Sequence, residues 1–359
     1  MYIAFYISSH GFGHMTRCLA IINRILNKTR YNIYIVCGKR QNDFARVYLN
    51  NFTGRVIYKD MTTDIGLINK INTLEIDKIE LEKSLINFIR SWNEIAISES
   101  EIISRLNVRC IISDISPIGL IVGKKLNIHT SFLSNFSWIE PYEYLNINEY
   151  IVNKFKKVFY EVDNLVTYDL SIGMDYIQSK DIHNVGMICR EVDKYKVMEI
   201  NKKYGKSIFI TAGKSTNLRS INIKNFSGTI FVTEGLNINS WEKATVVKLP
   251  IDILDTQNYI AASDIVIAKA GWGTIAEALI GHTRLVLIER PTSYEDILNI
   301  LKLKKQNLAI SITEEDLNNL DIEVINNISD KYIDYEKLRK YRNDLVNVEK
   351  IILENCNIE

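Results

Sequence analysis

A histidine follows a glycine-rich turn close to the N-terminus of the chain. The segment Ser8–Arg17, with the sequence SSHGFGHMTR, comes after an apolar run expected to be a strand and opens a segment expected to be a helix. Gly11 and Gly13 allow a tight turn and close approach of the backbone to a ligand, and a helix N-terminus attracts anions. His14 would stand at the start of this helix, where an imidazole with a pKa of about 6.5 can act as a general base. The same glycines also fit a plain strand-to-helix turn with surface histidines, because one Gly-x-Gly is a weak signal.

Asp114 is the candidate partner of this histidine. It ends an apolar, strand-like run that begins at Cys110, and Pro117 follows shortly after it. In the usual doubly wound order this strand lies beside the first strand. Asp114 could then accept the second N–H of His14, fix the tautomer and stabilise the imidazolium. The alternative is a helix cap for the run from Pro117, with the proline near the first helical position.

A second glycine turn lies in the C-terminal half of the chain. A buried, strand-like run leads through Lys269 into Gly271-Trp272-Gly273-Thr274 and then into a helix that carries Glu277. The N-terminus of that helix could hold a diphosphate, and Lys269 would add positive charge. The carboxylate of Glu277 could accept hydrogen bonds from the two hydroxyls of a ribose. Thr274 and Glu277 also fit a capping box, which needs no ligand.

Two more loops follow strands in this half. Gly213 and Ser215 lie in a short polar turn that could face the same diphosphate or be a plain loop. Glu295 and Asp296 follow Pro291 and could read sugar hydroxyls, or they could open a solvated helix, where acidic residues are favoured. The chain contains no Asp-x-Asp, so no visible motif calls for a metal ion. We expect no bound cofactor, since the nucleotide would be part of the substrate.

The motifs can lie close together if the chain folds into α/β units, because these place the loops after the strands at one edge of a sheet. Strand-like runs alternate with amphipathic runs of helix length, which indicates parallel sheets. Two such halves predict an N-terminal Rossmann-like domain over 1–187, a second one over 188–331 and a terminal helix within 332–359, which is expected over 332–355. Ligands bind such sheets at the carboxyl ends of the strands. Strands are expected at 2–8, 32–37, 55–58, 110–113, 130–133, 164–168, 207–211, 229–232, 245–248, 264–268 and 284–288, with a long helix over 78–106.

The composition narrows the class of protein. The 359 residues are 47% hydrophobic and 24% charged, and the net charge of +1 gives no strong field toward nucleic acid. Five dispersed cysteines predict free thiols in a reducing compartment. No leader is expected, and no apolar run approaches the roughly 18 residues of a membrane span. The expected location is therefore cytoplasmic. Lysines and aromatic residues over 150–160 fit a peripheral contact with the inner face of a membrane, or an ordinary solvated helix.

Together these residues resemble the GT-B nucleotide-sugar glycosyltransferases of the UDP-glycosyltransferase and peptidoglycan N-acetylglucosaminyltransferase type, over nearly the whole chain. The resemblance implies an α/β fold of two Rossmann-like domains that face each other across a cleft, with the C-terminal helix packed back on the N-terminal domain. It also implies that His14 is the catalytic base and Asp114 its partner. The implied donor-binding residues are Gly11, Gly13, Gly213, Ser215, Ile253, Lys269, Gly271, Gly273, Thr274, Glu277, Glu295 and Asp296.

The sequence departs from the family pattern in places. Lys269 stands where the family has a histidine, and Asp296 stands where it has a sugar-reading glutamine. The segments 113–117 and 134–138 look like the glycosyltransferase-like region of plant L-arabinokinases. The segment 13–19 looks like the nucleotide-sugar hydrolase of pseudaminic acid synthesis, whose acceptor is water.

The predicted activity is the inverting transfer of a hexose-type sugar from a UDP- or dTDP-linked donor, in cell-envelope or glycoconjugate synthesis. The diphosphate would leave into the positive ends of the two helices. We expect the acceptor, a small molecule, a glycan or a lipid-linked sugar, on the first domain, where Asn135, Trp138 and Tyr142 could line its site or merely pack. A nucleotide-sugar hydrolase and a non-catalytic nucleotide-sugar-binding module are the alternatives.

Overall fold

The computed structural model describes residues 1–70, 75–211, 221–233, 236–240, 244–250 and 253–355. Its contacts divide the chain into two compact units. The first unit contains Met1–Lys70, Glu75–Gly186 and the segment that begins at Asp344, and the second contains Met187–Asn343.

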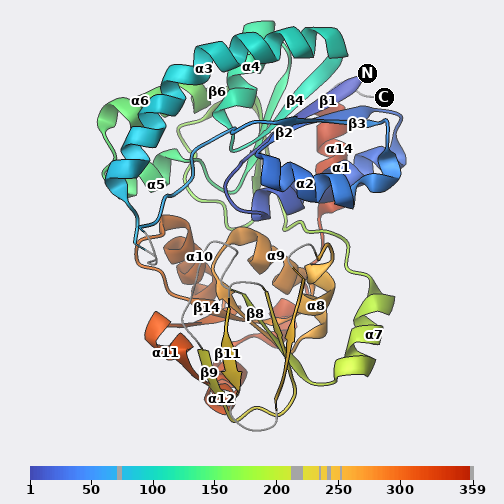
Figure 1. Cartoon of the computed structure of the whole chain (residues 1–359), viewed down its shortest axis with the longest axis vertical. Coiled ribbons are helices and arrows are strands. Elements are labelled where there is room, and N and C mark those ends of the chain that lie inside the picture. Colours follow the sequence, from blue (N-terminus) through green and yellow to red (C-terminus); the bar gives the residue numbers. More distant parts are fainter. Residues whose placement is uncertain (71–74, 212–220, 234–235, 241–243, 251–252, 356–359) are drawn as a thin grey trace. The chain divides into compact units, whose positions relative to one another are not determined.

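The first unit is built on a seven-stranded parallel sheet in the order β3-β2-β1-β4-β5-β6-β7 (Figure 1). Its central strands are buried on both faces, which explains why they read as continuous apolar runs rather than alternating ones. The expected neighbourhood of the first and fourth strands is confirmed, because Ile7 pairs with Asp114. The strands are β1 (Tyr2–Ile7), β2 (Asn32–Cys37), β3 (Val56–Asp60), β4 (Val108–Asp114), β5 (Thr130–Ser134), β6 (Glu161–Tyr168) and β7 (Gln178–Val185).

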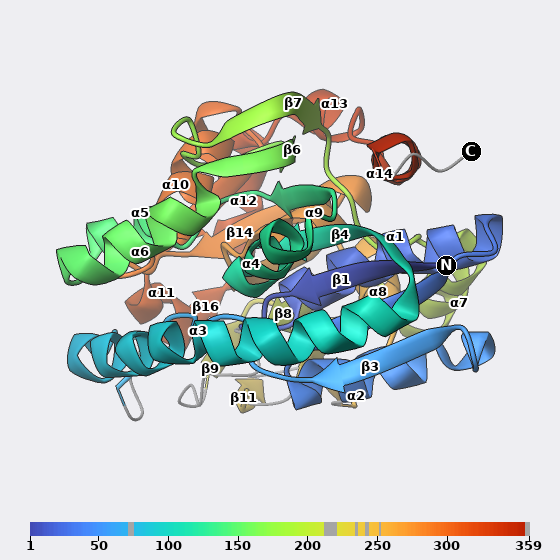
Figure 2. The same ribbon diagram turned by 90° about the horizontal axis from the view of Figure 1, so that it is seen from above.

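Helices pack on this sheet in two groups. One group contains α3, α4 and α6, and the other contains α1, α2 and α14 (Figure 2). The long helix α3 coincides with the range expected from its apolar spacing. Asp77 caps its start, and the left-handed residue Asn107 ends it. The helices are α1 (Gly13–Lys28), α2 (Lys39–Tyr48), α3 (Lys78–Leu106), α4 (Pro117–Leu126), α5 (Ile139–Tyr144), α6 (Glu149–Phe159) and α14 (Leu345–Asn355), with a 3₁₀ turn η1 (Asn50–Phe52).

The C-terminal helix returns to the first unit, as the resemblance implied. Helix α14 packs on α1 and β7, and Arg24 of α1 forms an ion pair with Glu349 (Figure 1). The helix is shorter than the expected range of 332–355, because it begins only at Leu345. The preceding residues form α12 (Ile322–Tyr332) and α13 (Tyr335–Leu338), which belong to the second unit.

The second unit contains a six-stranded parallel sheet in the order β12-β10-β8-β13-β14-β15 and a three-stranded sheet in the order β11-β9-β16. All five strands expected in this half are present. The strands are β8 (Ser207–Thr211), β9 (Ile221–Lys224), β10 (Thr229–Val232), β11 (Ile238–Ser240), β12 (Thr245–Lys248), β13 (Ile265–Lys269), β14 (Arg284–Ile288), β15 (Ala309–Ile312) and β16 (Asn319–Asp321). The other helices are α7 (Lys194–Tyr204), α8 (Thr256–Ala262), α9 (Trp272–Ile280), α10 (Tyr294–Lys305) and α11 (Glu314–Asn318).

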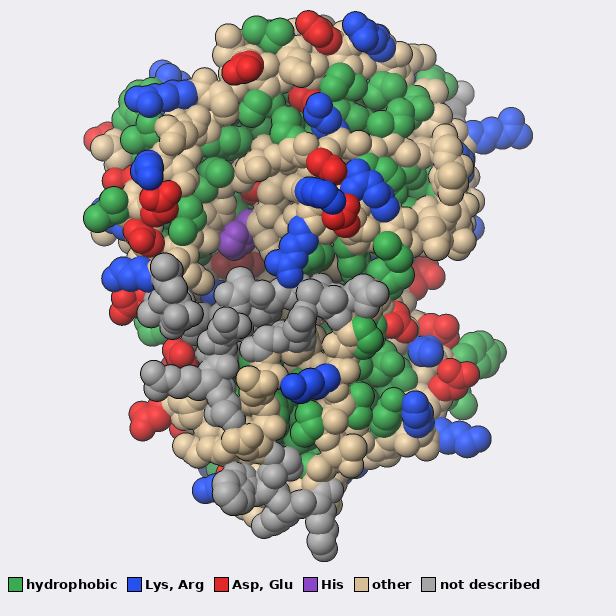
Figure 3. Space-filling model, in the orientation of Figure 1, with side chains coloured by type: hydrophobic (Ala, Val, Ile, Leu, Met, Phe, Trp, Pro, Cys, Tyr) green, Lys and Arg blue, Asp and Glu red, His purple; other side chains and the backbone are tan. Residues whose placement is uncertain are grey.

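Lysine and arginine side chains are interspersed with acidic ones on the face shown in Figure 3, in keeping with the near-zero net charge. No helix in the described part of the chain is long and apolar enough to cross a membrane.

Cys18, Cys37 and Cys189 are free thiols, but Cys110 is disulfide-bonded, so the expectation of free thiols throughout is wrong there. Sequence spacing does not show which cysteines the fold brings together.

Candidate functional site

In the first unit, the candidate site lies where the strand order reverses between β1 and β4. Ligands of doubly wound sheets bind at this switch point, outside the carboxyl ends of the strands. Asp114 is the last residue of β4, and His14 is in the first turn of α1. The Nδ1 atom of His14 lies 2.7 Å from Oδ1 of Asp114. The carboxylate is fully buried, whereas the imidazole keeps 12% of its surface exposed.

Asp114 also holds Arg17, one turn further along α1. Nε and Nη2 of Arg17 donate to the two carboxylate oxygens at 2.6 and 2.5 Å, and Nη1 donates to Oδ1 of Asn135 at 2.5 Å. The guanidinium is buried and lies over the ring of Tyr168. Sequence reasoning missed this residue, because an arginine in a helix usually reaches solvent. The site is therefore a triad of His14, Asp114 and Arg17 rather than a simple pair.

The charges in this triad fix the proton on the imidazole. Burial would raise the pKa of Asp114, but Arg17 and His14 together hold it well below its ordinary value. Because an ionised carboxylate can only accept, the proton between the two side chains belongs on Nδ1 of His14, which leaves Nε2 with a lone pair. Nη2 of Arg17 also lies 2.9 Å from Nδ1, but it cannot donate to a nitrogen that already carries a proton. The arrangement thus presents Nε2 as a base.

Helix capping does not account for Asp114. The residue that caps α4 is Ser116, whose hydroxyl accepts from the backbone N–H of Ile118, with Pro117 at the first helical position. The alternative of an aspartate cap is therefore wrong. Ile115, between the two, has φ of +56°. A β-branched residue rarely adopts this conformation, and such strain tends to occur at functional sites.

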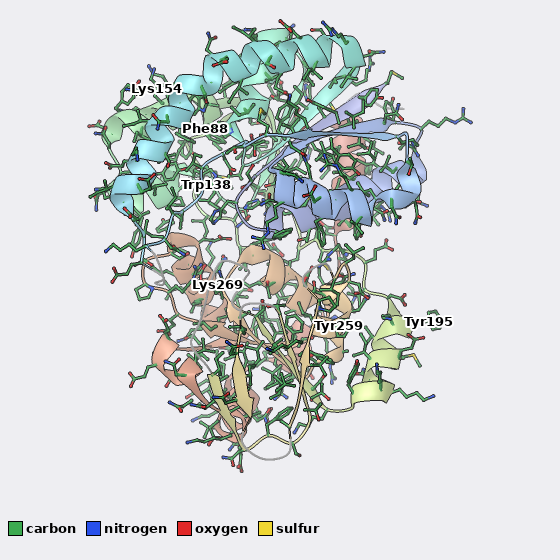
Figure 4. The ribbon with its side chains drawn as sticks, in the orientation of Figure 1. Phe88, Trp138, Lys154, Tyr195, Tyr259 and Lys269 are labelled. Atoms are coloured by element: carbon green, nitrogen blue, oxygen red, sulfur yellow. The ribbon has the colours of Figure 1, made fainter. Side chains whose placement is uncertain are left out.

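The residues expected on the acceptor side are buried. Asn135 is held by Arg17, and Trp138 lies inside the first unit (Figure 4), where its Nε1 donates to Asp64 at 2.7 Å. The hydroxyl of Tyr142 donates to the backbone carbonyl of Ile65. These rings therefore pack against the segment 64–65 rather than presenting an open aromatic surface.

Asp64 links that packing to the glycine turn. Its other oxygen accepts from the backbone N–H of Ser9 at 2.7 Å. Burial raises the pKa of this carboxyl, against the hydrogen bonds from Ser8 and Trp138 and the influence of His14. In the turn, Gly11 has φ of +70°, which glycine adopts without strain. Asp64 was not singled out from the sequence, because it stands in a polar loop without a motif.

In the second unit, the carboxyl ends of β8, β13 and β14 meet at one edge of the sheet, because these three parallel strands are neighbours. Gly213 and Ser215, which follow β8, lie outside the described residues. Gly271 is the N-cap of α9, so Gly273 and Thr274 fall in its first turn. Their backbone N–H groups have no acceptor within the described residues. They are therefore available to an anion.

The capping-box alternative for this helix is wrong. Helix α9 begins two residues before Thr274, and Glu277 does not reach back to the helix start. Its Oε1 atom instead accepts from Nη2 of Arg190 at 2.6 Å, and both side chains are almost fully buried. Ile253, the expected base-binding residue, donates its backbone N–H to the carbonyl of Pro250 at 3.2 Å.

Lys269 ends β13 directly before the glycine turn (Figure 4). Within the described residues its amine has no hydrogen-bond partner. Burial and the nearby guanidinium of Arg290 lower the pKa of Lys269 to about 8, against the opposite effect of Asp296 and Glu295. A largely buried amine without a partner suits an anionic ligand.

The two acidic residues after Pro291 differ in role. Asp296 is buried and takes a bidentate contact from Arg290, at 2.5 and 2.8 Å. It is therefore not part of a solvated helix start, and its oxygens are occupied by a neighbour. Glu295 is less buried, and its Oε1 lies 3.4 Å from the backbone N–H of Trp272. Of the pair, Glu295 is the better placed for a ligand. Within the described residues, no three His, Cys, Asp or Glu side chains gather as metal ligands.

Comparisons with known proteins agree with this geometry. Residues 200–344 match the glycosyltransferase family 28 C-terminal domain. An L-arabinokinase of Arabidopsis thaliana is 24% identical over 301 residues, which cover 80% of this chain and 28% of the relative. The chain thus spans little more than a quarter of that relative's length.

Solved structures show the same fold. The chain is similar to Arabidopsis thaliana UGT89C1 complexed with UDP-L-rhamnose, with a TM-score of 0.67, 12% identity and 99% coverage of both chains. It is also similar to Phytolacca americana UGT2 complexed with UDP-2fluoro-glucose and pterostilbene, with a TM-score of 0.65, 10% identity and the same coverage.

Fold and C-terminal domain together define the class of protein. The chain has the GT-B fold, with two parallel Rossmann-like sheets. Its residues 200–344 match the glycosyltransferase family 28 C-terminal domain, and the chain is distantly similar to L-arabinokinase. The resemblance inferred from the motifs is thereby confirmed.

Proposed function

We propose that this chain transfers a hexose-type sugar from a nucleotide diphosphate sugar to a hydroxyl nucleophile with inversion, and that His14 is the general base. The observation that carries this proposal is the 2.7 Å contact between Nδ1 of His14 and the buried carboxylate of Asp114. That contact leaves Nε2 able to take a proton, and a positioned base of this kind contributes about 10²–10⁴-fold to a rate.

In the proposed reaction, Nε2 of His14 removes the proton of the nucleophile as its oxygen bonds to the anomeric carbon. The bond between that carbon and the diphosphate oxygen breaks, and the nucleoside diphosphate leaves as an anion. Asp114 stabilises the imidazolium that forms. The N-terminus of α9 and the ammonium of Lys269 receive the charge of the leaving group.

A nucleotide-sugar hydrolase is the second candidate. The burial of Asn135, Trp138 and Tyr142 favours it, because these residues do not supply the expected aromatic acceptor surface. With water as the nucleophile, the same histidine and the same donor contacts suffice. The two candidates differ only in the acceptor.

Nucleoside diphosphate release from a panel of UDP-, dTDP- and GDP-sugars separates them. We expect one donor to turn over, and His14→Ala to lower the rate by about 10²–10⁴-fold. His129→Ala is the matched control, because His129 also lies beside a carboxylate, Asp163, but at the amino end of β5. Fast release without an acceptor means hydrolase, and release that needs an added acceptor means transferase. Full activity in His14→Ala would remove the proposed base.

A further inference from the structure

Arg190 is a buried arginine in the second unit to which the reaction above gives no role. Its side chain is almost fully excluded from solvent. Nη2 donates to Oε1 of Glu277 at 2.6 Å and to the hydroxyl of Thr256 at 2.8 Å, and Nη1 donates to the backbone carbonyl of Leu254. One guanidinium therefore joins three segments that are far apart in the sequence.

Two of these segments belong to the proposed donor site. Leu254 follows Ile253, the residue expected to bind the base, and Thr256 begins α8. Glu277 lies on α9, whose N-terminus is the proposed diphosphate site. Because a planar guanidinium holds its donors in a fixed fork, Arg190 sets the position of the base loop (residues 253–254) relative to the Glu277 carboxylate.

The two oxygens of the Glu277 carboxylate differ in their contacts. Oε1 of Glu277 is occupied by Arg190, whereas Oε2 has no donor within the described residues. Oε2 is not among the buried side-chain atoms that lack a hydrogen-bond partner, so it is open at the surface of the site, where a ligand hydroxyl can donate to it. A ribose hydroxyl is such a donor. A 2′-deoxyribose has one hydroxyl fewer to offer.

We propose that Arg190 is a positioning residue that makes the donor site selective for ribonucleotides. It holds Glu277 so that Oε2 accepts from the ribose, and it ties this contact to the base loop through Leu254. The inference rests on the proposed nucleotide-sugar site and narrows its substrate class. The site would select donors with a full ribose, such as UDP-sugars, over 2′-deoxy donors, such as dTDP-sugars.

The test compares the binding of UDP and 2′-deoxy-UDP by calorimetry. Wild type should prefer UDP by about 10–100-fold, the range for a hydrogen bond to a charged group. Arg190→Lys keeps the charge but loses the fork. This variant should bind UDP at least tenfold more weakly than wild type. Its affinity for 2′-deoxy-UDP should change by less than threefold, so the preference for UDP should be lost. Arg284→Lys is the matched control, because Arg284 also donates to a backbone carbonyl, of Asp264, and to a carboxylate, of Asp330. It should keep the wild-type preference.

A second variant keeps the test decisive if Arg190→Lys does not fold. Arg190→Met combined with Glu277→Gln removes both buried charges together, which avoids leaving one unpaired. It should bind the two nucleotides equally. Thermal unfolding of each variant establishes that the binding data come from folded protein.

The outcomes separate this inference from the proposed function. Equal weakening of UDP and 2′-deoxy-UDP in Arg190→Lys would overturn the positioning role, since a merely structural arginine would act on both alike. A wild type that binds both equally but still turns over a UDP-sugar would overturn the ribose selectivity and leave the proposed function intact. A wild type that binds no nucleotide would remove both.

Discussion

Protonation of Lys269 should control nucleotide binding at mildly alkaline pH. In the nucleotide-free protein its pKa is lowered to about 8, chiefly by burial. A bound diphosphate favours the ammonium form and raises this pKa. Binding should therefore need a protonated Lys269, and the nucleotide should take up a proton as it binds.

The size of the effect follows from the protonated fraction. With a pKa of about 8, about 91% of the free protein carries the ammonium at pH 7 and about 9% at pH 9. The affinity for UDP should thus fall about tenfold over this range. The terminal phosphate of the nucleotide does not contribute, because its pKa of about 6 lies below this range.

Titration calorimetry of UDP at pH 7, 8 and 9, in two buffers of different ionisation enthalpy, measures both the affinity and the proton uptake. About half a proton should be taken up at pH 8 and most of one at pH 9. Lys269→Arg is the control, since a guanidinium stays charged throughout. Its affinity should not change with pH, whatever its absolute value. Lys269→Met should bind weakly and also without pH dependence.

The pH dependence of folding stability tests the lowered pKa of Lys269 independently of nucleotide binding. A lysine whose pKa is lower in the folded protein than in the unfolded chain destabilises the fold while it is charged. Relative to Lys269→Met, nucleotide-free wild type should therefore gain stability as the pH rises above 8. An affinity for UDP that stays constant from pH 7 to pH 9, or an equal slope in Lys269→Arg, would refute the reasoning.

Three further substitutions test other parts of the structure. Asp114→Asn should lower turnover about 10²–10⁴-fold and lower the melting temperature, because it removes the tautomer control and leaves Arg17 buried without a counter-charge; turnover and thermal unfolding measure both. Trp138→Phe should cost about 1–3 kcal/mol in denaturant unfolding, because Asp64 loses a buried donor; an unchanged midpoint would contradict this. Gly119→Ala should cost about 1–3 kcal/mol, because its Cβ would lie 2.9 Å from Cβ of Tyr6. Its affinity for UDP should stay that of wild type.

The wild type should also lose stability in acid through Asp114. The pKa of this carboxyl lies below that of the unfolded chain, so its contribution is present at neutral pH and is lost as the pH falls below about 4. Asp114→Asn should show a weaker pH dependence of the free energy of unfolding between pH 6 and pH 3. Equal dependence in the two proteins would contradict the proposed charge state of the triad.

The sheets were predictable where strands are buried on both faces. Continuous apolar runs marked β1, β4 and β13, and the doubly wound order then placed Asp114 beside His14. Strand β7 was missed because its mostly exposed edge position gives it a polar sequence. The short strands β9, β11, β15 and β16 were missed because their three or four residues alternate polar and apolar types. The equally short β10 and β12 were predicted because each has consecutive apolar and β-branched residues.

The partners of the site residues were less predictable. Sequence order indicates that His14 and Asp114 come together, but it does not show that Arg17 occupies both oxygens of the same carboxylate. Asp296 was expected near a sugar, and the sequence does not show that Arg290 holds its carboxylate. Such pairings depend on side-chain directions across strand ends, which residue type and spacing do not encode.

The configuration of the first-formed product tests the central claim most directly. Proton NMR on a reaction with an α-linked nucleotide sugar reports the anomeric proton of the new glycoside, or of the free sugar if water is the acceptor, before mutarotation. A single displacement by a nucleophile that His14 activates predicts the β-anomer, formed by wild type and not by His14→Ala. An α-configured first product would contradict the account.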